Sequence, residues 1–317
     1  MPGLPSFSRW YSRRPLSWAL VLSLLGLLPL GCSRSREDAG ARSSPTYTDQ
    51  PATPARQRYL FAVHPLYNPA KLGQVYQPLL DYLNARLPGA QLELEASRDY
   101  AEYEKKLRHR QAEVILPNPL QTLHALGTGY RVIAIAGSPA DFRGLFLVRR
   151  DSGIHSLQEL KGRTLAYPAR TALAACILPQ WLLHQQGIDV NKDLVNRYVG
   201  SQESAIMNAC LGEAAAGVTW PLPWRAFQKD HPREAAQLRV LAETPTLISN
   251  SVMVRDDLPE AFVTSLRQLL LELDRSPEGR RIQAGMETDR FLPGTAADYE
   301  PAREFIGRFA REVRPID

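Results

Sequence analysis

The feature that most constrains the fold is a regular alternation of short apolar runs and amphipathic stretches, which begins near residue 59. Apolar runs of strand length lie at 59–63, 92–95 and 114–116. Between the first two runs, large aliphatic residues recur four positions apart over 74–87, which is the spacing of one helical face. Strands that alternate with helices predict parallel βαβ units, so the expected fold class is α/β with mostly parallel sheets flanked by helices.

The same alternation continues through the rest of the chain. Further strands are predicted at 131–136, 145–149, 164–167, 214–219, 239–242 and 247–254. Further helices are predicted at 100–110, 156–160, 171–186, 202–211 and 302–313. About 260 residues take part, which is enough for two lobes of ordinary domain size.

The N-terminal segment is a targeting signal and not part of this pattern. Basic residues in the first fourteen positions precede a short apolar core at 18–30, which is broken by Ser, Gly and Pro. This arrangement is typical of a secretory signal peptide, here expected over 1–31. Cys32 follows a small residue at the end of that core and resembles the lipidated cysteine of bacterial lipoproteins. The alternative is an uncleaved anchor with Cys32 incidental. Both interpretations place the rest of the chain outside the cytoplasm, and the lipoprotein resemblance implies the periplasmic side of a bacterial cell envelope.

A polar segment at 32–57 follows, rich in Ser, Thr, Pro and charged residues. It has no apolar period and predicts a disordered tether. Loss of the signal removes three of the 38 basic residues and none of the 33 acidic ones, leaving 35 against 33. The high isoelectric point therefore comes mostly from targeting and gives no support for a nucleic-acid partner.

The stretch 200–221 has the order turn, helix, strand. Ser201, Gln202 and Glu203 lie at the predicted helix start, where unpaired backbone N–H groups and the helix dipole suit an anion. The other interpretation is a capped helix that only packs on a sheet.

Several motifs then occur in a known order. They are Asp99-Tyr100, Asp151 to Ile154, Leu157 to Gly162, the glycine turn at Gly200, Glu243 to Pro245, Asp256 to Ala261 and Gly294 to Tyr299. In this order, over about residues 58–311, the chain resembles the type II, Venus-flytrap solute-binding proteins of ABC importers that carry phosphonate, phosphite or phosphate. The resemblance implies one lobe at 58–142 plus 249–317 and another at 146–245, joined by two crossovers. It also implies a cleft that closes by hinge motion on a small anion, and docking of the closed form on a membrane permease.

The resemblance also implies where ligand contacts lie. Tyr100 matches a ligand-contacting tyrosine of the family. The family's Ser/Thr hydroxyls at the next helix start fall on 172–175, which is Ala-Leu-Ala-Ala here. Arg170 and Thr171 lie just upstream and could replace those hydroxyls, although Arg170 could equally be solvated. After the glycine turn the family usually carries His-Asp or His-Glu. Here the pair is Gln202-Glu203, so an acidic group remains and the titratable histidine is lost.

Three loop residues complete the candidate site. Asn118 lies between two prolines that fix its loop, Trp220 ends a predicted strand, and Tyr67 follows the first strand. Burial in the core is the alternative for Trp220, and a surface loop is the alternative for Tyr67.

A disulfide, a metal site and a catalytic site each have little support in the sequence. Cys176 and Cys210 could form a disulfide in an oxidising compartment, or be two buried small residues. No metal-ligand spacing or catalytic motif occurs, so neither an enzyme nor a cofactor or metal is predicted.

Two functions remain. The first is a monomeric, membrane-anchored binding protein that captures a phosphonate-like oxyanion for an ABC importer. The second keeps the fold but serves a membrane sensor or another envelope partner instead of transport.

Overall fold

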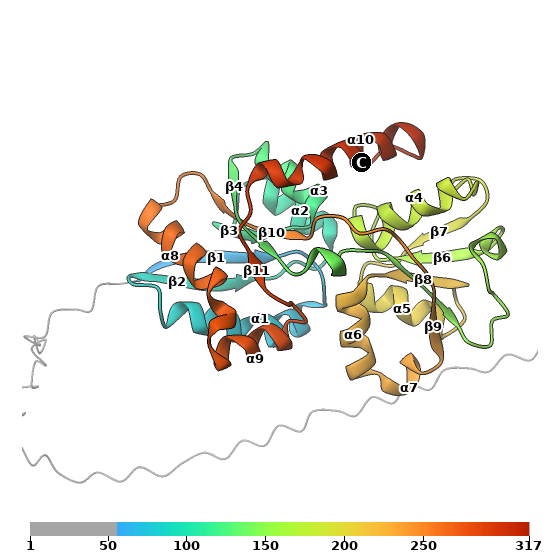
Figure 1. Ribbon diagram of the computed structural model, residues 1–317, viewed down its shortest axis with the longest axis horizontal. Coiled ribbons are helices and arrows are strands. Elements are labelled where there is room, and N and C mark those ends of the chain that lie inside the picture. The colour runs from blue at the N-terminus through green and yellow to red at the C-terminus, as the bar shows by residue number, and fades with distance from the viewer. Residues whose placement is uncertain (1–55, 317) are drawn as a thin grey trace, which may run out of the picture. The chain divides into compact units, whose positions relative to one another are not determined.

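The structure is a computed structural model that describes residues 56–316, and in this range the chain forms two sheets in two lobes (Figure 1). The predicted signal peptide, Cys32 and nearly all of the predicted tether lie outside the described residues. The predicted tether ends at residue 57, whereas the first strand already begins at Gln57.

The first sheet has the strand order β11-β4-β10-β3-β1-β2. Strands β1 to β4 run in one direction, while β10 and β11 run against them. The bounds are β1 Gln57–Val63, β2 Ala90–Glu95, β3 Val114–Leu116, β4 Tyr130–Ala136, β10 Asn250–Arg255 and β11 Phe291–Leu292. The predicted strand at 247–254 therefore begins three residues late, at Asn250.

The second sheet has the order β7-β6-β8-β5-β9, and only β5 runs against the others. Its strands are β5 Leu145–Arg149, β6 Thr164–Tyr167, β7 Val195–Tyr198, β8 Ala216–Thr219 and β9 Leu238–Glu243. In each sheet most strands point the same way, as the alternating pattern predicts, but both sheets are mixed because β10, β11 and β5 pair antiparallel with their neighbours. The sequence missed β7 because its side chains are mostly exposed or half-buried, so that strand lacks an apolar run.

Helices cover both faces of the sheets. They are α1 Pro69–Asn84, α2 Tyr100–Arg108, α3 Pro119–Leu126, α4 Leu178–Gln185, α5 Gln202–Cys210, α6 Pro221–Asp230, α7 Pro232–Ala235, α8 Glu260–Leu271, α9 Pro277–Gly285 and α10 Glu300–Glu312. Alternate residues of β1 pack on opposite sides: Phe61 and Val63 join the large core with α1, whereas Ala62 joins the core under α2.

Two helices that the sequence missed begin at a proline after a strand end. Asn118 caps α3 by accepting from the Gln121 N–H at 3.0 Å, and Pro119 follows as the first helical residue. Trp220 and Pro221 open α6 in the same way. The sequence predicted a loop at Asn118 and only the end of a strand at Trp220, but proline also suits the first turn of a helix, where its missing N–H costs nothing.

The chain passes between the sheets twice, from β4 to β5 and from β9 to β10 (Figure 1). This pair of crossovers defines two lobes. A further link is α10, which starts in the first lobe and reaches α4 of the second. Phe305 packs edge-on against Trp181 at 5.8 Å, and Arg314, which is 6% exposed, donates to Gln180 Oε1 at 2.8 Å.

The α5–β8 contact depends on a residue without a side chain. A Cβ on Gly217 of β8 would lie 2.3 Å from the backbone oxygen of Ala205 in α5. Gly217→Ala should therefore lower the free energy of unfolding by about 1–3 kcal/mol, because the helix must move off the sheet.

The matched control is Gly73→Ala in α1, where an added Cβ meets nothing within 4 Å. There the higher helix propensity of alanine should raise the free energy of unfolding by up to about 1 kcal/mol. Urea denaturation measures both values, and equal effects at the two glycines would contradict the packing argument.

Candidate functional site

A small cavity lies between the lobes. Its volume is about 10 Å³, room for about one water molecule. The lining residues come from both lobes and are His64, Tyr100, Asn118, Phe142, Ala172, Leu173, Ala174, Ala175, Gln202, Trp220 and Asn250. Of the predicted site residues, the structure brings Tyr100, Asn118, Gln202 and Trp220 together here.

Gln202 joins the two lobes at this cavity. Its Oε1 accepts from the Thr219 hydroxyl at 2.9 Å, and its Nε2 donates to the Tyr100 hydroxyl at 3.3 Å. Since Tyr100 accepts this bond, its own phenol proton remains available to donate into the cavity. Burial raises the pKa of Tyr100, so the phenol stays protonated.

Asn118 forms the second polar contact across the lobes. Its Oδ1 caps α3, and its Nδ2 donates to the backbone oxygen of Thr171 at 3.3 Å. The Thr171 side chain does not line the cavity, and Ser201 is used as the cap of α5, accepting from the Ser204 N–H at 3.0 Å. Asn118 therefore has a structural task in addition to its place on the cavity wall.

The helix start opposite Tyr100 carries no hydroxyl. Residues Leu173–Ile177 form a π-helical turn that continues into α4, and all five side chains are buried. The first N–H groups of a helix lack partners within it and are suited to an anion. The backbone can thus bind an oxyanion where the side chains cannot.

The lining residues of this cavity include no Lys, Arg, Asp or Glu. His64 is 2% exposed, and its Nδ1 lies 3.0 Å from the Leu116 backbone oxygen. That oxygen only accepts, so Nδ1 carries the proton and Nε2 is an acceptor. Burial lowers the pKa of His64 to about 4, so the ring is neutral at physiological pH.

The apolar part of the wall comes from two aromatic residues. Trp220, 3% exposed, packs against Phe142 with ring centroids 5.5 Å apart. Trp220 is therefore both part of the core and on the cavity wall, and the two interpretations of this residue are not exclusive.

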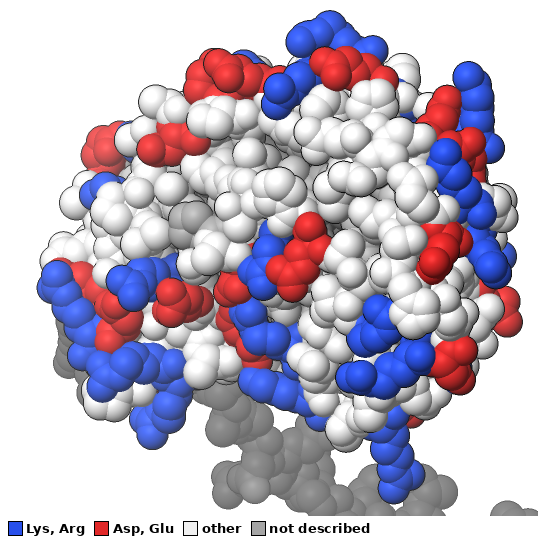
Figure 2. All heavy atoms as spheres, turned by 45° about the vertical axis from the view of Figure 1, so that its right-hand side comes forward, with Lys and Arg blue, Asp and Glu red and all other residues white. Residues whose placement is uncertain are grey.

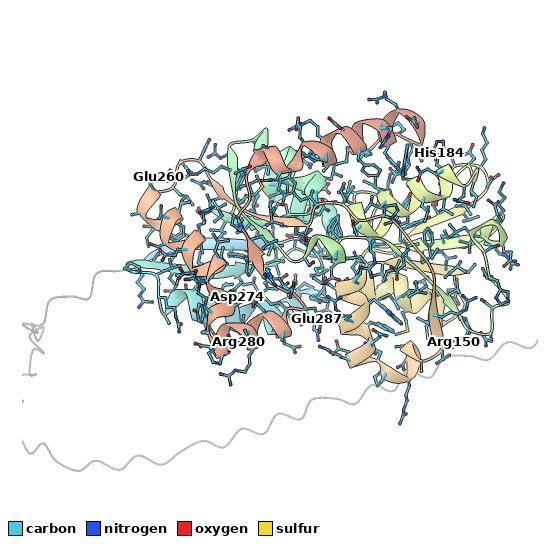
Figure 3. The ribbon with its side chains drawn as sticks, viewed as in Figure 1. Arg150, His184, Glu260, Asp274, Arg280 and Glu287 are labelled. Atoms are coloured by element: carbon cyan, nitrogen blue, oxygen red, sulfur yellow. The ribbon has the colours of Figure 1, made fainter. Side chains whose placement is uncertain are left out.

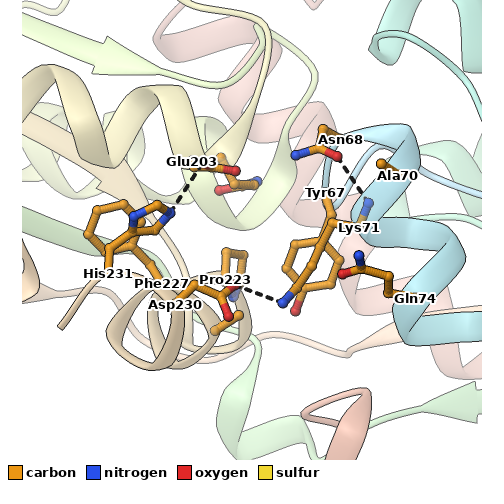
Figure 4. Close-up of a pocket in the computed structure, with 12 residues that line it drawn as sticks. Tyr67, Asn68, Ala70, Lys71, Gln74, Glu203, Pro223, Phe227, Asp230 and His231 are labelled. Atoms are coloured by element: carbon orange, nitrogen blue, oxygen red, sulfur yellow. Dashed lines mark hydrogen bonds and ion pairs between the residues drawn. The ribbon is translucent and has the colours of Figure 1, made fainter.

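A larger outer pocket of about 330 Å³ opens beside the cavity, and Gln202 lines both (Figure 4). Two of the predicted residues, Tyr67 and Glu203, line this pocket instead of the cavity. Glu203 Oε1 lies 3.4 Å from His231 Nε2, and Lys71 pairs with Asp230 across the lobes at 2.7 Å. The outer pocket therefore contains charge, in contrast to the cavity.

Arg170 lines a third pocket, of about 320 Å³, together with Tyr100 and Thr171. Tyr100 also lines the cavity, so the two spaces meet at this residue. The guanidinium carbon of Arg170 is 5.5 Å from the centre of the Tyr198 ring. The predicted replacement of the missing hydroxyls by Arg170 and Thr171 thus does not reach the cavity in this structure, because both face the neighbouring pocket.

An ion-pair network also links the lobes. Arg225 of α6 bonds Asp141 Oδ2 at 3.0 Å and Glu287 Oε2 at 3.1 Å, and Lys229 pairs with the same Glu287. Figure 3 shows Glu287 at the junction of the lobes, beside α6. Elsewhere basic and acidic side chains are interspersed, as the face in Figure 2 shows.

Asn250 and Phe142 were missed by sequence reasoning. Phe142 lies in a crossover, and Asn250 begins β10 directly after the other crossover, where no recognisable motif indicates a ligand contact. Cys176 and Cys210 are buried and free, so the disulfide alternative is not realised.

No cluster of potential metal ligands is found among residues 56–316. In the same range no helix has both the length and the apolar character needed to span a bilayer.

The two sheets with two crossovers and an interlobe cavity define a type II periplasmic binding protein. A family model described as the periplasmic substrate-binding protein of phosphonate ABC transporters matches residues 61–299. The chain belongs to this family, which places it in the periplasm.

A curated relative supports the same family. The Prochlorococcus marinus (strain MIT 9301) protein named "Probable ABC transporter phosphite binding protein PhnD1" is 23% identical over 196 residues. The match covers 58% of this chain and 66% of the relative, just under two thirds of its length.

Solved structures with low identity share the fold. The binding component of an ABC phosphonate transporter from Pseudomonas aeruginosa has a TM-score of 0.74 at 15% identity, over 81% of this chain and 88% of that one. PhnD1 of P. marinus with methylphosphonate also has 0.74, at 18% identity, over 81% and 99%. The alkanesulfonate-binding protein SsuA of Xanthomonas axonopodis pv. citri, bound to MOPS, has 0.58 at 16% identity, over 84% and 96%.

His64 should make the protein less stable in acid. Below the unfolded pKa of about 6.5 the unfolded chain gains a proton that folded His64 takes up only near pH 4. This difference should remove about 3 kcal/mol of the free energy of unfolding as the pH falls through that window. His64→Asn keeps a donor for Leu116 but does not titrate, so urea denaturation at a series of pH values should show a smaller loss. Parallel curves for the two proteins would contradict a buried neutral imidazole.

Proposed function

We propose that the protein captures a small oxyanion of the phosphonate class between its lobes and delivers it to an ABC importer. The observation that supports this most directly is the convergence of the Tyr100 hydroxyl and the 173–177 helix start on one interlobe cavity. Both offer donors, and an oxyanion is the ligand that accepts from several donors at once.

The cavity is too small for a phosphonate in its present shape. The lobes are closed to about the volume of one water molecule, so the ligand enters only when they separate. We take the lobes as 58–142 plus 249–317 and 146–245, which rotate about the two crossovers. Opening breaks the Gln202–Tyr100 and Lys71–Asp230 contacts and makes room for the ligand.

The other candidate residues lie around the ligand at different distances. Asn118, Gln202 and Trp220 contact the ligand from the cavity wall, whereas Tyr67, Glu203, Arg170, Thr171 and Ser201 surround it without direct contact in the closed form. The protein acts as a monomer, without enzymatic activity, and docks on a permease. The second candidate is a sensing or partner-binding protein of the same fold, and its one supporting observation is the absence of hydroxyls at 172–175.

We also propose that Cys32 carries a lipid that anchors the protein to the membrane. The apolar core and small residue before Cys32 support this, and the polar segment at 32–57 provides the length for the lobes to reach a permease.

Methylphosphonate should raise the melting temperature of the wild-type protein, because a ligand of the folded state stabilises it by mass action. Tyr100→Ala should abolish the rise. Tyr100→Phe keeps the ring and removes the donor, so it should weaken binding roughly tenfold or more. Calorimetric titration measures the affinities.

Tyr82→Phe is the control, because Tyr82 lies on α1 beneath Arg86 and outside the cavity. It should bind like wild type. If phosphate, phosphite, phosphonates, sulfate and carboxylates all fail to shift the melting temperature, the oxyanion proposal is wrong.

Replacing Cys32 tests the anchor. Full-length protein expressed in a bacterial envelope should fractionate with membranes, and Cys32→Ser should move it to the soluble periplasmic fraction, because the acyl chains have no other attachment site. Cys210→Ser, in the folded part, should leave fractionation unchanged. A Cys32→Ser protein that stays with membranes would favour the uncleaved anchor.

A further inference from the structure

The interlobe cavity has a buried acceptor without a donor. Asn250 is the first residue of β10, is 4% exposed and lines the cavity. Its Oδ1 is buried and has no hydrogen-bond partner among the described residues. Because an unpaired buried oxygen is unfavourable, a ligand that donates to it gains roughly ten- to hundredfold in affinity over one that cannot.

The rest of the wall limits the charge that a ligand can bring. No charged side chain lines the cavity, and the neutral His64 ring adds a second acceptor, its Nε2. A dianion enclosed there would lose its hydration without gaining a counter-charge, so a monoanion is favoured.

We propose that Asn250 is a specificity-determining residue that selects an oxyanion still carrying a proton. The proposal rests on the proposed function and narrows its ligand class. The O–H of a phosphonate monoanion donates to Asn250 Oδ1, while its other oxygens accept from Tyr100 and from the helix start at 173. A sulfonate has the same shape and charge but no proton, so it leaves Oδ1 unpaired.

Ligand binding depends on pH through the proton of the ligand, and the titratable groups near the cavity do not produce the same pH dependence. His64 and Tyr100 line it, and burial lowers the pKa of the first to about 4 and raises that of the second. Cys176 follows the lining helix start, and burial raises its pKa to about 11. Glu104 and Arg170 are separated from Asn250 by Tyr100, in the neighbouring pocket. Between about pH 6 and pH 8 the lining groups keep one protonation state, and the ligand changes its own.

The test compares methylphosphonate with methanesulfonate by calorimetric titration of wild-type protein. At about pH 6 methylphosphonate should bind roughly ten- to hundredfold more tightly. Its affinity should fall as the pH rises past its second ionisation, approaching about tenfold per pH unit, because the protonated form disappears at that rate.

Asn250→Leu removes the acceptor at similar size. The variant should bind the two ligands within about threefold of each other, and Asn191→Leu, outside the cavity, should keep the wild-type preference. Equal wild-type affinities for the two ligands, a phosphonate affinity independent of pH, or a preference retained in Asn250→Leu each overturns the inference and leaves the proposed function standing. Failure of wild type to bind either ligand overturns both. The wild-type ligand pair and pH series decide the question even if Asn250→Leu does not fold.

Discussion

One amide side chain joins the two lobes at the cavity. Gln202, 2% exposed, is held by Thr219 in its own lobe and bonds Tyr100 in the other. A buried amide must pair both its oxygen and its nitrogen, so each lobe satisfies part of the other's hydrogen-bonding requirement. This bridge also sets up a donor at the cavity. Because the Tyr100 hydroxyl accepts the hydrogen bond from Gln202, its own proton remains available to donate to a ligand.

Most of the fold could be predicted from periodicity. The strands at 145–149 and 164–167 were predicted correctly, because apolar runs act locally. The helices α3 and α6 were missed, since each begins at a proline that local reasoning interprets as a loop. The reversed direction of β10 comes from a crossover, and the strand's own residues do not encode it.

The site was less predictable, and the reason is physical. Tyr100, Asn118, Gln202 and Trp220 lie after strands or at helix starts, where ligands of α/β sheets bind, so local position indicated them. Asn250 is brought there only by the return of the chain between lobes, more than a hundred residues after Tyr100. Proximity of this kind depends on tertiary structure, which a single sequence does not reveal.

The contact of α10 with the second lobe affects how tightly a ligand binds and how long it stays bound. Arg314 and Trp181 hold the lobes together at a place separate from the cavity. A closed empty form whose cavity is too small for the ligand must open before binding, so it lowers the apparent affinity by the fraction of molecules that are open. The same clasp slows the exchange of ligand, since entry and exit both wait for the lobes to part. The C-terminal helix then controls residence time as well as affinity.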